Sequence, residues 1–188
     1  MAEVKILIKG YTSADSKESS DIETTSPTVT LIKDGNNNIV VDPGVLESQD
    51  LLAGKLKEEG LKVDDVNYVF LTHSHPDHHM NTGMFVKAKK LEFYGLWDNN
   101  KCLEWNKNFS NDIEIIKTPG HSDDSLTFLV KNDSGKIAVC GDVFWKENYP
   151  ADDHYANNKE KLAASRKKVL EIADYVIPGH GDIYKVNK

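Results

Sequence analysis

Four short apolar segments in this chain of 188 residues are each followed by a histidine or an aspartate, and no other feature restricts the fold as strongly. Each segment has the length and composition of a buried strand. The segments and the residues after them are 68–71 with His73, 113–117 with His121, 137–140 with Asp142, and 175–177 with His180. Because the carboxyl ends of strands in an α/β layer lie at one edge, we expect these side chains to converge there.

The rest of the chain predicts further strands and two helices around these segments. Apolar patterns predict strands at 4–8, 29–33, 39–41, 91–94 and 126–130, and helical spacing predicts helices over 45–59 and 157–173. The polar stretch 12–27 is interpreted as a loop, mobile by its composition. Strands followed by a helix occur twice, which predicts a layered α/β domain with helices covering two sheets. The length fits a single domain over residues 1–188.

Charge and composition argue against several classes of function. The chain has 30 acidic and 23 basic residues and a net charge of −7, and Arg166 is its only arginine, so it lacks the basic surface of a strongly electrostatic nucleic-acid binder. The basic runs at 87–90 and 166–168 are interpreted as solvated faces. No apolar run approaches about 20 residues, and the N-terminus does not resemble a secretory signal. We therefore expect a cytoplasmic protein without a membrane partner, in which Cys102 and Cys140 are buried, reduced thiols.

The segment 72–79 concentrates metal-binding side chains directly after a predicted strand. His73 and His75 are two residues apart, so both imidazoles can face one side, while Asp77 and His78 can serve a second centre. Imidazole nitrogen and carboxylate oxygen are ligands that suit Zn²⁺, and Fe or Mn also accept them. The sequence therefore predicts a metal site that also includes the three later strand-terminal residues.

Two histidines stay outside this predicted set. His79 is expected to be solvated or to support the site from behind. His154 lies in an aromatic-rich stretch, which is interpreted as a surface loop, with a pocket wall as the alternative.

The pattern HxHxDH at 73–78, with the order and spacing of the later ligands, resembles the metallo-β-lactamase-fold superfamily of binuclear metallohydrolases. The resemblance covers residues 28–182 and implies an αββα four-layer sandwich. It also implies two divalent metal ions, with Zn²⁺ as the first choice and Fe or Mn as options. His73, His75 and His121 would hold the first ion, Asp77, His78 and His180 the second, and Asp142 would bridge both.

The resemblance also implies a mechanism and a supporting residue. A hydroxide between the metals would attack the substrate, with Asp77 and Asp142 as the catalytic carboxylates. The segment 39–44 resembles the first motif of the family, in which Asp42 would support the site structurally.

The substrate stays open at this point. Segments 141–144 and 165–181 are similar to one branch of the family, which implies an RNA-type nuclease that cleaves phosphodiesters. Other branches hydrolyse the acyl bonds of thioesters, lactones or β-lactams, which would make the substrate a small molecule. An Fe-binding, non-hydrolytic protein with redox or oxygen chemistry is an alternative on the same fold, and a scaffold without catalysis is another. Homodimers occur in the family, so a homodimer also stays open.

Overall fold

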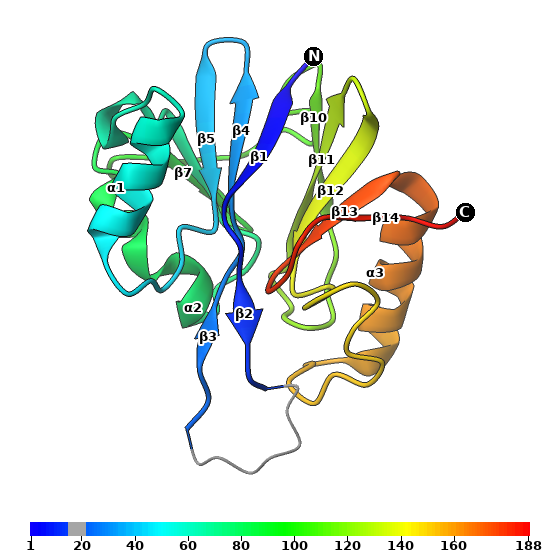
Figure 1. Ribbon diagram of the computed structural model, residues 1–188. Coiled ribbons are helices and arrows are strands. Elements are labelled where there is room, and N and C mark those ends of the chain that lie inside the picture. The colour runs from blue at the N-terminus through cyan, green and yellow to red at the C-terminus, as the bar shows by residue number, and fades with distance from the viewer. Residues whose placement is uncertain (15–21) are drawn as a thin grey trace.

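The computed structural model describes residues 1–14 and 22–188 and shows two β-sheets packed between outer helices (Figure 1). Helices α1 (Gln49–Glu58) and α2 (Pro76–His79) lie outside the first sheet, and α3 (Lys159–Ile172) covers the second. Two short 3-10 helices occupy Val63–Asp65 and Met80–Met84. The predicted αββα four-layer sandwich is confirmed.

The first sheet has seven strands in the order β1-β4-β5-β6-β7-β8-β9. Their bounds are Glu3–Ile8, Val29–Asp34, Asn37–Val41, Tyr68–Phe70, Lys89–Glu92, Gly95–Asp98 and Lys101–Leu103. Strand β6 lies between two parallel neighbours, and Val69 and Phe70 are fully buried in it. A continuous apolar run is typical of such a central strand, which is covered on both faces. The chain leaves β6 directly before the histidine segment.

The second sheet has five strands in the order β10-β11-β12-β13-β14. Their bounds are Ile113–Lys117, Leu126–Asn132, Gly135–Gly141, Tyr175–Pro178 and Tyr184–Lys185. Helix α3 connects the parallel strands β12 and β13. Apolar side chains from both sheets interlock between them, and the ring centroids of Phe70 and Phe128 are 4.8 Å apart. This packing fixes the strand ends of one sheet relative to those of the other.

Helix α1 begins at Gln49, whereas the helical spacing predicts a start at Val45. Ser48 ends the preceding loop and caps the helix, because its side chain accepts a hydrogen bond of 2.9 Å from the backbone N–H of Asp50. The backbone N–H of Val45 instead donates to the carbonyl oxygen of Asp77 at 2.7 Å. The segment before α1 is therefore attached to α2 and does not join the helix.

The polar stretch 12–27 is not a loop throughout. Its ends include two short antiparallel strands, β2 (Tyr11–Thr12) and β3 (Thr25–Ser26), while residues 15–21 and the mobility predicted for them lie outside the described residues. Strand β7 lies two residues before its predicted place, because the chain turns at 93–94. The sequence pattern does not predict β8, β9 or β14, which have only two to four residues each.

Two expectations for single residues are wrong. Cys140 is buried in β12, but Cys102 is exposed, because it lies on β9 at the edge of the first sheet. Arg166 does not belong to a solvated face: its guanidinium is half-buried against the loops of the second sheet, whereas Lys167 and Lys168 are exposed.

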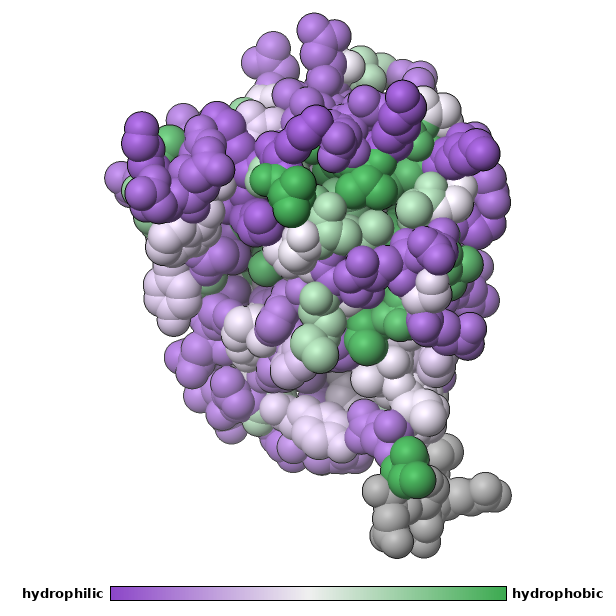
Figure 2. All heavy atoms as spheres, turned by 90° about the vertical axis from the view of Figure 1, so that its left-hand side faces the viewer, coloured by the Kyte–Doolittle hydropathy of each residue, from purple (hydrophilic) through white to green (hydrophobic). Residues whose placement is uncertain are grey.

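Among the described residues, no helix is long and apolar enough to cross a bilayer. The side of the molecule that carries α1 is mostly hydrophilic, with a patch of apolar residues near its centre (Figure 2).

Candidate metal centre

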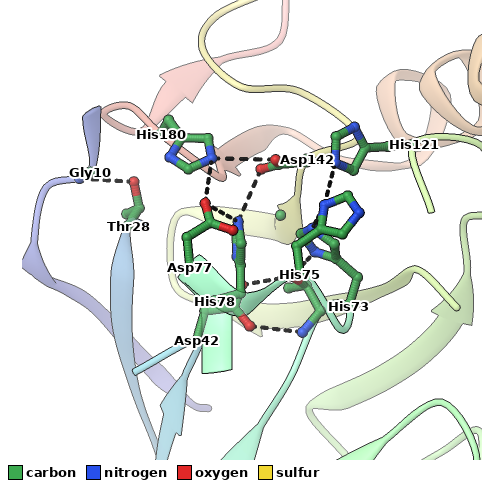
Figure 3. Close-up of polar contacts among 12 residues, drawn as sticks. Gly10, Thr28, Asp42, His73, His75, Asp77, His78, His121, Asp142 and His180 are labelled. Carbon is green, nitrogen blue, oxygen red and sulfur yellow. Dashed lines mark hydrogen bonds and ion pairs between the residues drawn. The ribbon is translucent and has the colours of Figure 1, made fainter. Parts of the chain in front are cut away.

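The structure brings all seven sequence-predicted site residues together at one edge of the sandwich (Figure 3). They follow four strands of the two sheets. The segment after β6 supplies His73, His75, Asp77 and His78, the loop after β10 supplies His121, the end of β12 supplies Asp142, and the end of β13 supplies His180. The site therefore lies across the interface between the two sheets.

His73, His75, His121 and Asp142 form the first group of candidate ligands. The Nδ1 atom of His75 lies 3.0 Å from Nε2 of His73 and 2.9 Å from Nε2 of His121. Neighbouring nitrogens in a tetrahedral zinc site are roughly 3.3 Å apart when each metal–nitrogen distance is about 2.0–2.1 Å. The three imidazoles therefore already converge as such a site requires.

Asp77, His78 and His180 form the second group, and Asp142 lies between the groups. Oδ2 of Asp142 is 3.3 Å from Nε2 of both His121 and His180, and its Oδ1 is 3.4 Å from Nε2 of His78. A Cβ atom at Gly179 would lie 1.8 Å from Oδ1 of Asp142, so only glycine permits this arrangement. The Asp142 carboxylate thus faces ligands of both groups.

Four of the five imidazoles are oriented by an acceptor on the side away from the site. Nδ1 of His73 lies 3.0 Å from Thr72 Oγ1, and Nδ1 of His78 lies 2.8 Å from Asp42 Oδ2. Nδ1 of His121 lies 2.7 Å from Asp153 Oδ2, and Nδ1 of His180 lies 2.9 Å from the carbonyl oxygen of Ser26. Carboxylate and carbonyl oxygens only accept, and the Thr72 hydroxyl donates its own proton to Asp42, so we assign the proton to Nδ1 in each ring. The Nε2 lone pairs then point into the site, as they do in histidines that bind metals.

Asp42 is the centre of a buried network behind these ligands. Its carboxylate accepts hydrogen bonds from the backbone N–H of Thr72 at 2.8 Å, from the Thr72 hydroxyl at 2.6 Å and from Nδ1 of His78 at 2.8 Å. Its backbone φ of 49° lies in the left-handed region, which is rare for a residue other than glycine. The three hydrogen bonds stabilise this conformation, and they agree with the supporting role that the first motif implies.

Burial and charge shift the pKa values of these groups in opposite directions. Burial lowers the pKa of His73 well below its ordinary value and also lowers that of His75. Burial alone would lower the pKa of His78 and His180 as well, but the Asp142 carboxylate outweighs it and raises both. Burial would raise the pKa of Asp142, yet His180 and His78 hold it well below its ordinary value. His73 and His75 therefore stay neutral to lower pH than His78 and His180.

The donor set fits divalent cations. Nε2 of His78 and Oδ1 of Asp142 are buried and make no hydrogen bond with any described residue. A buried polar atom without a partner costs about 1–3 kcal/mol, and a bound cation would satisfy both atoms. Imidazoles with a free Nε2 lone pair, combined with carboxylates, are the ligands that Zn²⁺, Fe and Mn take in proteins.

A cavity of about 420 Å³ opens over the site. Besides candidate ligands, its wall includes Glu23, Trp145 and Tyr155. The Tyr155 hydroxyl donates a hydrogen bond of 2.6 Å to Glu23, and its ring centroid lies 5.9 Å from that of Trp145. Among the described residues, no lysine or arginine lines this cavity. The wall is therefore aromatic and acidic.

The two remaining histidines lie outside both ligand groups. His154 is exposed and does not line the cavity over the site, although its neighbours in the aromatic-rich loop do. His79 is half-buried in the wall of an adjoining cavity of about 700 Å³, which His73 also lines.

Asp153 and Thr72 contribute to the site without being predicted. Asp153 is buried and orients His121, and Thr72 links Asp42 to His73. Thr72 directly precedes His73, so its position in the sequence could have indicated a role at the site. Nothing in the sequence marks Asp153, because only tertiary folding brings its loop, which precedes α3, next to His121.

Comparison with known proteins identifies the family. The model of the metallo-beta-lactamase superfamily matches residues 23–95. Metallo-beta-lactamase domain-containing protein 1 of Xenopus laevis is 32% identical, and the match covers 98% of this chain and 82% of that protein. A "probable metallo-hydrolase" of Methanocaldococcus jannaschii is 33% identical over 78% of this chain and 73% of its own length. The chain spans only 63%, 59% and 61% of the rat, human and mouse forms of the first relative.

Solved structures show the same fold. A metallo-beta-lactamase-type protein from Thermotoga maritima superposes with a TM-score of 0.74 at 24% identity, covering 98% of this chain and 99% of its own. An N-acyl homoserine lactone hydrolase, with its product bound at the catalytic metal center, superposes with a TM-score of 0.70 at 16% identity, covering 95% and 92%. Given the identity and coverage of the relatives, the chain belongs to the metallo-beta-lactamase superfamily and is one of its metallohydrolases.

Proposed function

We propose that this chain uses two divalent metal ions to hydrolyse an acyl bond. His73, His75 and His121 would hold one ion, Asp77, His78 and His180 the other, and Asp142 both. The observation that carries the proposal is the position of Asp142, whose two oxygens face both ligand groups. When bound, such a pair of ions polarises a substrate oxygen and lowers the pKa of coordinated water toward about 7. Zn²⁺ is our first choice for both ions, with Fe or Mn as options.

We assign proton transfer to Asp77. Its side chain is 19% exposed, compared with 5% for Asp142, and it lines the cavity over the site. Oδ2 of Asp77 accepts a hydrogen bond of 3.3 Å from the hydroxyl of Thr25, which holds the carboxylate in place. A carboxylate in this position can accept a proton from the attacking water and deliver it to the leaving group.

The cavity favours an ester, thioester, lactone or β-lactam. Its aromatic and acidic wall offers contacts to an uncharged acyl group but no basic side chain for a series of phosphates. The fold shared with the lactone hydrolase supports this class.

A phosphodiester of the RNA type is the second candidate. The adjoining cavity of about 700 Å³ is lined by Lys117 and Lys161, which could contact a phosphate next to the site. Two metal ions can themselves bind phosphate oxygens.

The test combines metal analysis with parallel assays. Metal-replete protein is assayed with an aryl ester, a glutathione thioester, a lactone, nitrocefin and single-stranded RNA. The variant Asp142→Ala is compared with the control Asp152→Ala, because the Asp152 side chain is 73% exposed. We expect bound metal and acyl hydrolysis in the wild type, a loss of at least about 100-fold in Asp142→Ala and little change in Asp152→Ala. Cleavage of RNA alone would move the assignment to the second candidate. Oxygen or thiol consumption with bound Fe and no hydrolysis would contradict both.

A further inference from the structure

We infer that Ser165 and Arg166 on α3 are positioning residues for the metal centre, because together they bind the backbone of the loops that carry His121, Asp142 and Asp153. This inference rests on the proposed function. Neither side chain touches the candidate ligands, so both act through the loops they hold.

Arg166 binds two loop carbonyls with one guanidinium. Its Nε donates to the carbonyl oxygen of Val143 at 2.8 Å, and Nη1 donates to that of Ala151 at 3.4 Å. Val143 directly follows Asp142, and Ala151 lies two residues before Asp153. The guanidinium therefore connects the end of β12 to the loop that orients His121.

Ser165, which directly precedes Arg166 on α3, binds the third of these loops, the one that carries His121. Its buried hydroxyl donates to the carbonyl oxygen of Pro119 at 2.7 Å, two residues before His121. The same loop lies directly against the start of α3, because the backbone N–H of Asn158 donates to the carbonyl oxygen of Gly120 at 2.9 Å. A Cβ atom at Gly120 would lie 2.2 Å from the backbone nitrogen of Leu162, so the loop cannot move closer to the helix.

The loop positions reach the ligands through Asp153. Its Oδ2 accepts from Nδ1 of His121 at 2.7 Å, and its Oδ1 accepts from the backbone N–H of Tyr155 at 2.9 Å. A shift of the loop near Ala151 would therefore move Asp153 and turn the imidazole of His121. That rotation would take Nε2 of His121 away from Asp142 and from Nδ1 of His75, which lie 3.3 Å and 2.9 Å from it.

The chemistry of arginine suits this task better than that of lysine. A guanidinium presents several N–H donors in a rigid plane, whereas a lysine ammonium on a flexible stem is a single point of contact. Arg166 is the chain's only arginine, and its Nη2 is buried without a hydrogen-bond partner among the described residues. The guanidinium carbon lies 5.4 Å from the ring centroid of Phe144, which limits its movement.

The test measures Zn²⁺ affinity by competition with a chromophoric chelator in the full chain. We compare the wild type with Arg166→Met, Arg166→Lys and Ser165→Ala, and use Lys167→Met as the control because Lys167 is the exposed neighbour on the same helix. We expect Arg166→Met to weaken binding of one Zn²⁺ equivalent by about 10–100-fold, Arg166→Lys and Ser165→Ala by less, and Lys167→Met by less than about twofold.

Hydrogen exchange of the metal-free variants is the second readout. Arg166→Met should speed exchange in 119–122 and 142–154 and leave α1 unchanged. If Arg166→Met does not fold, Arg166→Lys and Ser165→Ala decide. Variants that unfold at lower temperature but keep wild-type Zn²⁺ affinity would overturn the inference and leave the proposed function standing. Wild-type protein that binds no Zn²⁺, Fe²⁺ or Mn²⁺ would overturn the proposed function and this inference with it.

Discussion

At the scale of the residue, Asp153 shows how a carboxylate that is not itself a candidate ligand can orient a histidine that is one. It accepts the Nδ1 proton of His121 and leaves Nε2 free for a cation. We predict that Asp153→Asn weakens metal binding about 10–100-fold, because the amide no longer fixes the imidazole by charge. Chelator competition measures the effect, with Asp152→Asn as the exposed control. Equal affinity in the two variants would show that Asp153 has no role in orienting His121.

As the pH falls, metal ions should leave the two ligand groups in a fixed order. The pKa values of His78 and His180 are raised by the Asp142 carboxylate, so protons compete with a cation there at higher pH than at His73 and His75, whose pKa values are lowered. We predict that falling pH releases metal from the second group first and that activity declines below about pH 6. Metal content after gel filtration at stepwise lower pH measures the order. Release of both ions in one step would contradict it.

The candidate ligands and the supporting Asp42 were predictable at this scale, whereas the supports Asp153 and Arg166 were not. Positions after predicted strands identify the histidine segment together with His121, Asp142 and His180, and the likeness to a known family divides these residues between two ions. Asp153 and Arg166 act through loop conformations that no local pattern encodes. The sequence misassigns Arg166 to a solvated face because the adjacent lysines are solvated.

At the scale of the element, α1 shows what an amphipathic helix contributes. Leu52 is fully buried against the first sheet, whereas the adjacent Leu51 is 41% exposed. We predict that Leu52→Ala lowers the free energy of unfolding by about 2–5 kcal/mol, because it removes packed methyl groups and leaves a cavity. Leu51→Ala should stay within about 1 kcal/mol of the wild type. Urea titration measures both, and similar losses in the two variants would contradict the packing described for α1.

Elements with a continuous apolar run or a clear period were predictable. Strand β10 has the predicted bounds, and α3 ends within a residue of its predicted end. Strand β9 has three exposed residues and exists because β8 offers it backbone partners. Pairing of that kind depends on tertiary structure, which a short sequence window does not contain.

At the scale of the whole molecule, the candidate ligands belong to both sheets, so a bound cation should hold the sheets together. A ligand that binds only the folded state adds about 4 kcal/mol when its free concentration is 1,000 times its dissociation constant. We predict that removing metal with a chelator lowers the Tm and that Zn²⁺ restores it. Asp142→Ala should show little of this shift, since its carboxylate faces both groups. Scanning calorimetry at several Zn²⁺ concentrations provides the measurement, and a Tm independent of Zn²⁺ would contradict it.

The layered architecture was predictable from the order of strands and helices together with the family likeness. The packing of the two sheets, which sets the distances between candidate ligands, required the structure. The homodimer and the extent of a single domain stay predictions.

The order of the ligands along the chain has a consequence for synthesis. The segment after β6 is made first, while His180 follows every other candidate ligand and belongs to the strand that α3 must first carry back to β12. A nascent chain therefore holds an incomplete centre until this last strand has docked. The centre would be chemically silent in every folding intermediate that lacks β13, and turnover would begin only once His180 has joined the other candidate ligands.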